Sequence, residues 1–152
     1  MFTSIVVGTD GSAPAREAVR AATEMARLCG AQLHVVSAYR VFGDMVLVAA
    51  ALEEKAVAGT GTEERIRADV EAMLGGLARE LEAQGVAVTT HASADSPAQA
   101  ILDEADRRRA DLIVVGNRGT HNPGALGSVP NNVVHLAPCS VLVVHTWPPS
   151  RT

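Results

Sequence analysis

The chain of 152 residues is 47% hydrophobic, 20% charged and 3% aromatic, with a formal net charge of −4 at pH 7. This length corresponds to one domain, which excludes a multidomain enzyme. The acidic balance and the few aromatic rings argue against nucleic acid as a partner, because nucleic acids bind basic surfaces and aromatic stacking platforms. The most apolar stretch, Met45 to Leu52, has eight residues, whereas a membrane span needs about 20. No membrane association is therefore expected.

We expect a cytoplasmic protein, because the first residues lack the basic start of a signal peptide. The two cysteines, Cys29 and Cys139, lie 110 residues apart and form no CxxC pair, so no zinc or redox site is predicted. We expect one domain over residues 1–146, followed by a short tail over residues 147–152.

The first half of the chain predicts strands that alternate with helices. Thr3 to Gly8 is a β-branched run that ends in glycine, which is typical of a strand buried on both faces. Ser12 is expected to cap a helix that Gly30 ends. Three segments follow, namely a strand over Gln32 to Ala38, an alanine-rich stretch of helical composition over Val46 to Val57, and a long helix over Thr62 to Glu82.

The second half continues the alternation. Val86 to His91 predicts a third strand. The next helix has the clearest start signal, with Ser96 as the N-cap, a proline directly after it and Gln99 at the capping-box position, and it runs to Arg109. The remaining segments are strands over Leu112 to Val115 and Val141 to Val144, and a helix that opens near Ser128.

Five apolar strands that alternate with helical segments predict an α/β fold. Strands buried on both faces indicate a parallel sheet with helices on each side, and right-handed crossovers make this sheet doubly wound and Rossmann-like. Such sheets bind ligands at the carboxyl ends of their strands, where the strand order reverses. The loops after the first and fourth strands are therefore the places to look for function.

Both of these loops are rich in glycine. The first contains Thr9, Asp10 and Gly11, and the second begins with Gly116 and Asn117 and leads to a helix that starts near Gly127. Glycines let backbone amides approach an anion closely, and the free amides of a helix start can seat a phosphate. A carboxylate at Asp10 could accept from a ribose hydroxyl or hold a metal ion beside the phosphates. Together the two loops favour a nucleotide.

Known catalytic patterns are missing from the sequence. The only lysine, Lys55, lies outside both glycine loops, so there is no Walker A loop, and neither GxGxxG nor GxSxG occurs. No two of the five histidines have the helical spacing of metal ligands. His121 alone lies in a glycine loop. We therefore predict no catalytic residue and no metal site, and a protein that is not an enzyme beyond, at most, weak ATP hydrolysis.

Four segments stand where the motifs of one known family stand: VVGTDGS at Val6 to Ser12, VVGNRG at Val114 to Gly119, GSVP at Gly127 to Pro130 and APCSVLVVHT at Ala137 to Thr146. On these motifs the chain resembles the universal stress protein family over essentially its whole length. SAY at Ser37 to Tyr39 and GSVPNNV at Gly127 to Val133 further resemble actinobacterial members that bind cyclic AMP.

The resemblance implies a sheet of strand order 3-2-1-4-5, a cytoplasmic role in stress responses and a homodimer joined along the fifth strand, Val141 to Val144. It also implies an adenine nucleotide as ligand, either ATP, AMP or cyclic AMP, with Mg²⁺ accompanying ATP. The positions that match the nucleotide-binding motif are Thr9, Asp10, Gly11, Ala38, Gly116, Asn117, Gly119, Gly127, Ser128 and Val129. Asp10 would lie at the ribose, the backbone of Ala38 at adenine, and the later glycines and Ser128 at the phosphates.

The sequence departs from the family pattern in one loop. Seven residues separate Gly119 from Gly127, where the pattern has nine. A loss of two residues shortens the reach of the loop by up to ~7 Å, which favours one phosphate over a triphosphate.

Two other functions stay open at this point. A nucleotide-free interaction module that acts through dimer surfaces is favoured by the shortened loop. A phosphate-transfer enzyme would need Asp10 as metal ligand and His121 as acid-base group. The regulated partner protein cannot be named from the sequence.

Overall fold

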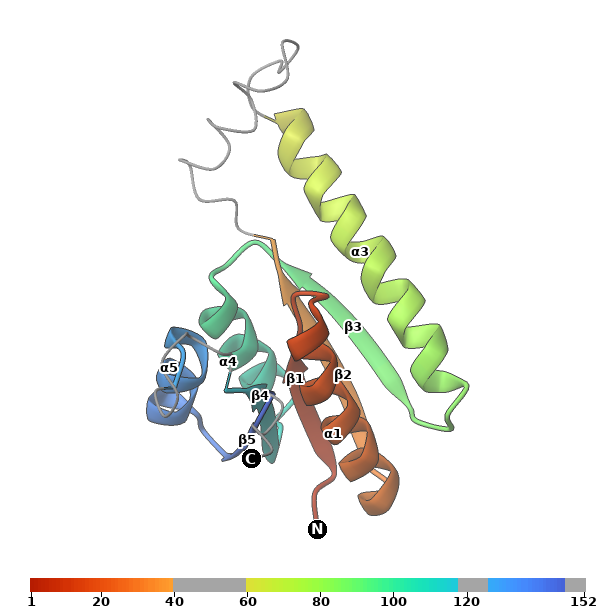
Figure 1. Ribbon diagram of the computed structural model, residues 1–152, viewed down its shortest axis with the longest axis vertical. Coiled ribbons are helices and arrows are strands. Elements are labelled where there is room, and N and C mark those ends of the chain that lie inside the picture. Colours follow the sequence, from red (N-terminus) through yellow and green to blue (C-terminus); the bar gives the residue numbers. More distant parts are fainter. Residues whose placement is uncertain (40–59, 118–125, 147–152) are drawn as a thin grey trace, which may run out of the picture.

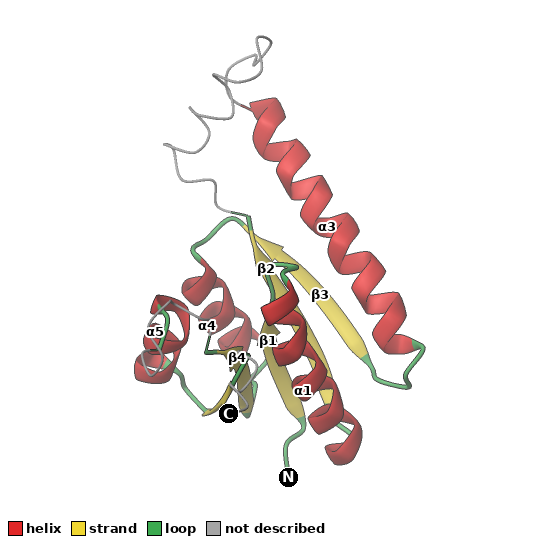
Figure 2. Cartoon of the chain, viewed as in Figure 1, coloured by secondary structure: helices red, strands yellow, loops and turns green. Residues whose placement is uncertain are grey.

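The computed structural model describes residues 1–39, 60–117 and 126–146. Its strands and helices alternate along the chain (Figures 1 and 2). In chain order they are β1 (Ser4–Gly8), α1 (Ala13–Cys29), β2 (Gln32–Ala38), α3 (Thr60–Glu82), β3 (Val88–Ser93), α4 (Pro97–Arg107), β4 (Leu112–Gly116), α5 (Ser128–Leu136) and β5 (Ser140–Val144). The predicted helix over residues 46–57 and the tail over residues 147–152 lie outside the described residues.

The five strands form one parallel sheet in the order β3-β2-β1-β4-β5. The predicted fold class and strand order are thus confirmed. Alternate residues of β1 face opposite layers: Ile5 packs with α1 and α3, while Val6 packs with α4 and α5. Both side chains are fully buried, which is why the sequence of this central strand is apolar without alternation.

Helix α1 begins and ends as its sequence predicts. The Ser12 hydroxyl accepts a hydrogen bond from the Ala15 N–H at 3.3 Å. At the other end, Gly30 has a φ of 64°, and the Ala31 N–H donates to the Ala26 carbonyl at 2.9 Å. A left-handed glycine with this bond is a Schellman ending.

The predicted capping box of α4 is wrong, although the helix starts at Pro97 as expected. Ser96 makes no side-chain capping bond, and the Gln99 amide donates to Asp103 at 2.6 Å instead. The helix also ends two residues before the predicted Arg109. Arg109 has a φ of 48°, and the N–H of the following Ala110 donates to the Ala105 carbonyl at 2.8 Å, so the chain has already left the helix.

The third strand begins two residues later than predicted and ends at Ser93. Val86 belongs to the ending of α3, because its N–H donates to the Leu81 carbonyl at 3.4 Å and the N–H of Gly85 donates to Glu82 at 2.9 Å. Both Val86 and Leu81 are buried. This hydrophobic contact across a Schellman motif explains why an apolar, β-branched residue lies outside the strand. Helix α3 itself starts at Thr60, two residues before the prediction.

Polar groups at the starts of the strands are bonded within the chain. The Asp111 carboxylate accepts from the N–H groups of Thr3 at 2.8 Å and Ser4 at 3.1 Å. Burial opposes ionisation of this carboxyl, but these hydrogen bonds outweigh it, and the pKa of Asp111 lies below its ordinary value. His34 hydrogen-bonds Thr89 across two strands. Burial, and next the charge of Arg108, lower the pKa of His34.

A buried carboxylate lies near the same end. Glu104 of α4 is 1% exposed, and it accepts from Arg107 at 2.6 Å and from Arg108 at 2.8 Å. Both bonds are charge-assisted, so the burial of this charge is compensated.

None of the helices in the described ranges is both long and apolar enough to cross a membrane.

Candidate functional site

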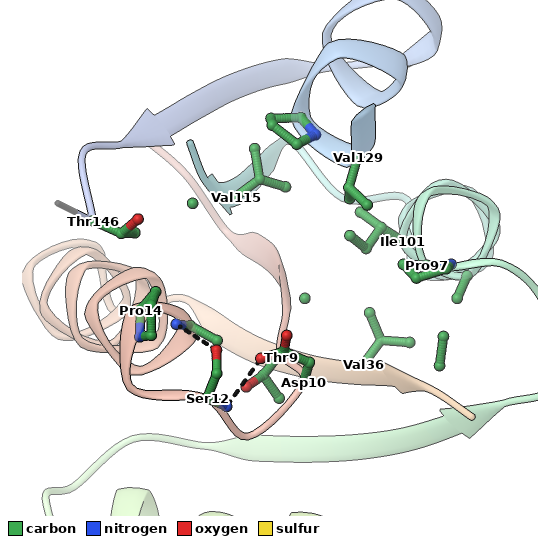
Figure 3. Close-up of a pocket in the computed structure, with 16 residues that line it drawn as sticks. Thr9, Asp10, Ser12, Pro14, Val36, Pro97, Ile101, Val115, Val129 and Thr146 are labelled. Carbon is green, nitrogen blue, oxygen red and sulfur yellow. Dashed lines mark hydrogen bonds between the residues drawn. The ribbon is translucent and has the colours of Figure 1, made fainter. Parts of the chain in front are cut away.

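A cleft opens where β1, β2 and β4 end (Figure 3). Its volume is about 110 Å³, below the 300–1,000 Å³ that is usual for small-molecule pockets, so the described residues enclose part of a nucleotide-sized ligand. The lining residues come from both layers and from the sheet: Gly8, Thr9, Asp10, Ser12, Pro14, Ala15, Val36, Ala38, Pro97, Ala100, Ile101, Val115, Gly116, Val129, Pro130 and Thr146.

The loop after β1 is held by its own hydrogen bonds. The Thr9 N–H donates to the Val36 carbonyl at 2.9 Å, which extends the β1–β2 pairing beyond the strand. The Thr9 hydroxyl accepts from the Gly11 N–H at 3.2 Å, and Asp10 accepts from the Ser12 N–H at 2.9 Å (Figure 3). The exposed Asp10 carboxylate therefore stands in a defined position at the rim of the cleft.

Two glycines near this loop are required by their neighbours. A Cβ atom on Gly8 would lie 2.5 Å from the Ile101 side chain of α4. Gly11 has a φ of 78°, and a Cβ atom there would lie 2.6 Å from the sulfur of Met73 in α3. Gly8 thus lets α4 approach the sheet, while Gly11 contacts α3 on the other side of the loop from the cleft.

Helix α5 starts beside the cleft without a side-chain cap. Gly127 is its buried N-cap residue, and its N–H donates to the Asn117 carbonyl at 3.3 Å. Ser128 and Val129 follow in the first turn, where N–H groups have no acceptor inside the helix. The positive end of the helix dipole adds to the attraction of this site for an anion.

Asn117 joins the ends of the last two strands. Its side-chain oxygen accepts from both the N–H and the hydroxyl of Thr146 at 2.9 Å, and its N–H donates to Val144 at 2.8 Å. This places Thr146, rather than Asn117, in the wall of the cleft.

The predicted site residues divide by location. Those that line the cleft are Thr9, Asp10, Ala38, Gly116 and Val129. Gly11, Asn117 and Ser128 lie next to lining residues in the chain but not in the lining itself, and Gly127 lies two residues before the lining residue Val129. Gly119 and His121 lie outside the described residues.

Sequence reasoning missed the apolar wall that α4 contributes, Pro97, Ala100 and Ile101. The start signal at Ser96 and Pro97 could have indicated it, because a helix that follows a parallel strand begins at the same end of the sheet as the other crossover loops.

The cleft combines apolar walls with polar backbone groups at one edge. Val36, Ile101 and Val115 offer surface for a flat apolar body, and the start of α5 offers N–H groups for an anion. The described parts of the chain contain no group of three or more His, Cys, Asp or Glu side chains that could hold a metal ion. This arrangement suits recognition of a small anionic ligand.

Comparison with known proteins gives a consistent result. The family model described as the universal stress protein family matches residues 1–145. A universal stress protein of Thermus aquaticus is 39% identical over 148 residues, which covers 95% of this chain and 99% of that protein. A universal stress protein of Mycobacterium tuberculosis is 34% identical over 147 residues, which covers 95% and 97%.

A solved structure is also similar. The crystal structure of a universal stress protein in complex with cAMP superimposes with a TM-score of 0.70 and 30% identity, over 96% of this chain and 98% of that one. The full-length family match and the relatives above 30% identity lead to one conclusion: this chain belongs to the universal stress protein family.

Proposed function

We propose that this universal stress protein binds an adenine nucleotide in the cleft as a regulatory ligand. The observation that carries the proposal is the position of the α5 start, whose first turn lacks a side-chain cap and borders an apolar cleft at the strand ends. Such a site offers apolar contact to a base and backbone donors to a phosphate. The similar protein crystallised with cAMP supports the same class of ligand.

Each part of the ligand has a matching part of the cleft. Adenine packs between Val36 and Ile101 and meets the backbone of Ala38 at the end of β2. The ribose hydroxyls reach the Asp10 carboxylate, which can accept from them. The phosphate lies at the N–H groups of Ser128 and Val129, with the Ser128 hydroxyl as a further donor.

The ligand carries one phosphate, as AMP or cyclic AMP do. The segment between Gly119 and Gly127 is two residues shorter than the family pattern. A shorter loop favours a compact phosphate group over a triphosphate.

The ligand acts by linkage and undergoes no substantial reaction. Asp10 is the one titratable side chain among the described residues that line the cleft, so these residues offer no matched acid and base. A bound nucleotide instead shifts the protein toward the conformation that binds it better, and this shift changes the affinity for a partner protein. The partner in turn changes the affinity for the nucleotide by the same factor.

A thermal-unfolding panel with ATP, AMP and cyclic AMP, each with and without Mg²⁺, tests this function. A ligand at 100 times its Kd adds about 2.7 kcal/mol, which corresponds to a midpoint rise of about 5–10 °C for a chain of this size. We expect this rise with cyclic AMP or AMP and a smaller one with ATP. A larger, Mg²⁺-dependent rise with ATP would contradict the single-phosphate site, and no rise with any nucleotide would refute nucleotide binding.

We further propose that the protein forms a homodimer along β5. Among the described strands, β5 pairs with β4 alone, and Leu142 is 37% exposed. On the neighbouring α5, Val134 is 45% and Leu136 67% exposed. An unpaired strand edge beside exposed apolar side chains favours pairing with a second copy. Light scattering should give twice the mass of the chain, and Leu142→Lys should give the monomer mass.

An interaction module without a nucleotide is the second candidate function. The exposed apolar side chains of α5 and β5 favour it, because they supply a protein-binding surface that needs no ligand in the cleft. This candidate would be favoured over the first if extracts of the purified protein showed no adenine absorbance and no nucleotide raised the unfolding midpoint.

A further inference from the structure

A second cavity lies between α1 and α3 and shares Thr9 with the cleft. Both helices pack on the same face of the sheet, and β3 is visible between them in Figure 1. The groove has a volume of about 560 Å³, within the range of small-molecule pockets. Its lining residues are Thr9, Gly11, Arg16, Glu17, Val19, Arg20, Thr23, Ala72, Met73, Gly76, Leu77, Glu80, Leu81 and Gln84.

The floor of the groove is apolar in character. Val19 and Leu81 are each 4% exposed, and Leu77 packs against the same core cluster. Two buried threonine hydroxyls line the groove. That of Thr23 donates to the Val19 carbonyl at 2.7 Å and that of Thr9 accepts from the Gly11 N–H at 3.2 Å, so both have a polar partner within the chain. An apolar chain therefore fits this surface.

Four charged side chains line the groove: Arg16, Glu17 and Arg20 from α1, and Glu80 from α3. Arg20 is paired with Glu17 at 3.0 Å and Glu24 at 2.9 Å. Arg16, in the first turns of α1, makes no ion pair within the described parts of the chain, and neither does Glu80 in the last turns of α3. Because both helices run back against the strands, these two residues lie toward opposite ends. The groove thus offers a cation at one end and repels a second anion at the other.

Gly76 keeps the groove open at a cost to its helix. A glycine inside a helix is about 1 kcal/mol less favourable than alanine, yet a Cβ atom at Gly76 would meet nothing within 4 Å. No close packing within the described chain requires glycine there. A side chain at this position would project into the groove, so the absence of one preserves the space.

We propose that the groove binds an amphipathic monoanion, with its apolar chain along Leu77 and Leu81 and its carboxylate at Arg16. A medium-chain carboxylate has this chemistry, because guanidinium groups pair with carboxylates and each buried methylene adds apolar contact. The site uses neither the apolar walls of the nucleotide cleft nor the start of α5, and it does not depend on the proposed function.

Titration calorimetry with hexanoate, octanoate and decanoate, each below its micelle-forming concentration, tests the site, and amide NMR shifts locate it. The affinity should rise about fourfold per buried methylene. Amide shifts should change along α1 and α3. Dodecanedioate, with a second carboxylate near Glu80, and decylamine should both bind more weakly than decanoate.

Two matched pairs of variants decide whether the groove is the site. Arg16→Gln should weaken decanoate binding about three- to tenfold, whereas Arg27→Gln, on the same helix outside the lining, should leave it unchanged. Gly76→Leu should abolish binding while raising the unfolding temperature, and Gly75→Ala should raise this temperature and keep binding.

Three outcomes would overturn the proposal: no saturable binding by the natural sequence, equal affinity for decylamine, or binding that survives both Arg16→Gln and Gly76→Leu. A Gly76→Leu protein whose mass by light scattering is half that of the natural protein would also overturn it, because a second copy of the chain would then cover the groove.

Discussion

The two ends of the sheet use their polar groups differently. Where the strands begin, Asp111 accepts from two backbone N–H groups and the buried Glu104 accepts from two arginines. Where the strands finish, α1 is capped by Ser12, but α5 begins at Gly127, which has no side chain to cap it. Bonds within the chain thus serve stability at one end, while the other end leaves donors for a ligand.

This difference separates stability from binding. Substitutions at the starts of the strands should change the free energy of unfolding and leave nucleotide binding intact. Substitutions at the start of α5 should do the reverse. Substitutions at the starts of α1 and α4 should have intermediate effects, because both helix starts face the cleft but only Ser12 makes a capping bond.

The largest effect is expected from Gly127→Asp. Gly127 has φ −61° and ψ 166°, which an N-cap aspartate adopts readily. Its carboxylate would accept from the Val129 N–H, because Pro130 at the next position has no N–H, and it would repel a phosphate. The stabilisation of about 2.7 kcal/mol by cyclic AMP at 100 times the Kd of the natural protein should be lost, with the ligand-free midpoint unchanged or higher. Gly127→Asn serves as the uncharged control, and an undiminished shift in Gly127→Asp would refute the phosphate site at α5.

At the opposite end, Glu104→Gln should lower the free energy of unfolding by about 2 kcal/mol, because one of the two acceptor oxygens becomes an NH2 group and the other loses its charge. Urea unfolding measures this change. Glu17→Gln removes a carboxylate from an exposed ion pair and should cost less than about 0.5 kcal/mol. Equal costs for the two variants, or a loss of cyclic AMP binding in Glu104→Gln, would contradict the conclusion that one end of the sheet serves stability and the other serves binding.

The two serine caps provide a smaller, matched comparison. Ser12→Ala should cost about 1 kcal/mol, because it removes a formed capping bond. Ser96→Ala should cost less than about 0.5 kcal/mol, because its hydroxyl makes no such bond. Thermal unfolding without nucleotide measures both, and a larger cost for Ser96→Ala would contradict the hydrogen bonding described for α4.

The smallest effect should appear in the pH dependence of Asp111→Asn. The pKa of Asp111 is lowered in the folded protein, so its contribution to stability is present above the pKa of the unfolded chain, about 3.9. It is lost as the pH falls through the lower folded value. The natural protein should therefore exceed Asp111→Asn in unfolding free energy at about pH 5, and the difference should shrink toward about pH 2. A difference that stays constant with pH would contradict the role assigned to these hydrogen bonds.

Local patterns predicted the fold well and the site in part. The apolar strands, Ser12 and Gly30 have local causes, and their predictions are confirmed. Val86 shows the limit, since its place in the ending of α3 depends on a contact with Leu81 that periodicity does not reveal.

The candidate site shows the same limit. Asp10 and Gly116 follow strand ends, so topology alone directs them to the cleft. The α4 wall and Thr146 depend on how helices cross the sheet and on the bond between Asn117 and Thr146. The start signal at Ser96 and Pro97 indicates only the end of the sheet at which α4 begins, whereas the bond between Asn117 and Thr146 joins distant segments and has no signature in the sequence near either partner.

The central position of β1 determines the order in which the sheet can assemble. This strand is made first, yet it pairs with β2 on one side and with β4, which starts at Leu112, on the other. The hydrogen bonds between Thr3 and Asp111 close a separation of 108 residues. Contacts so distant along the chain carry a high closure entropy and slow folding. During synthesis, one edge of the central strand therefore stays unpaired until residues 112–116 have been made, and the sheet can be completed only afterwards.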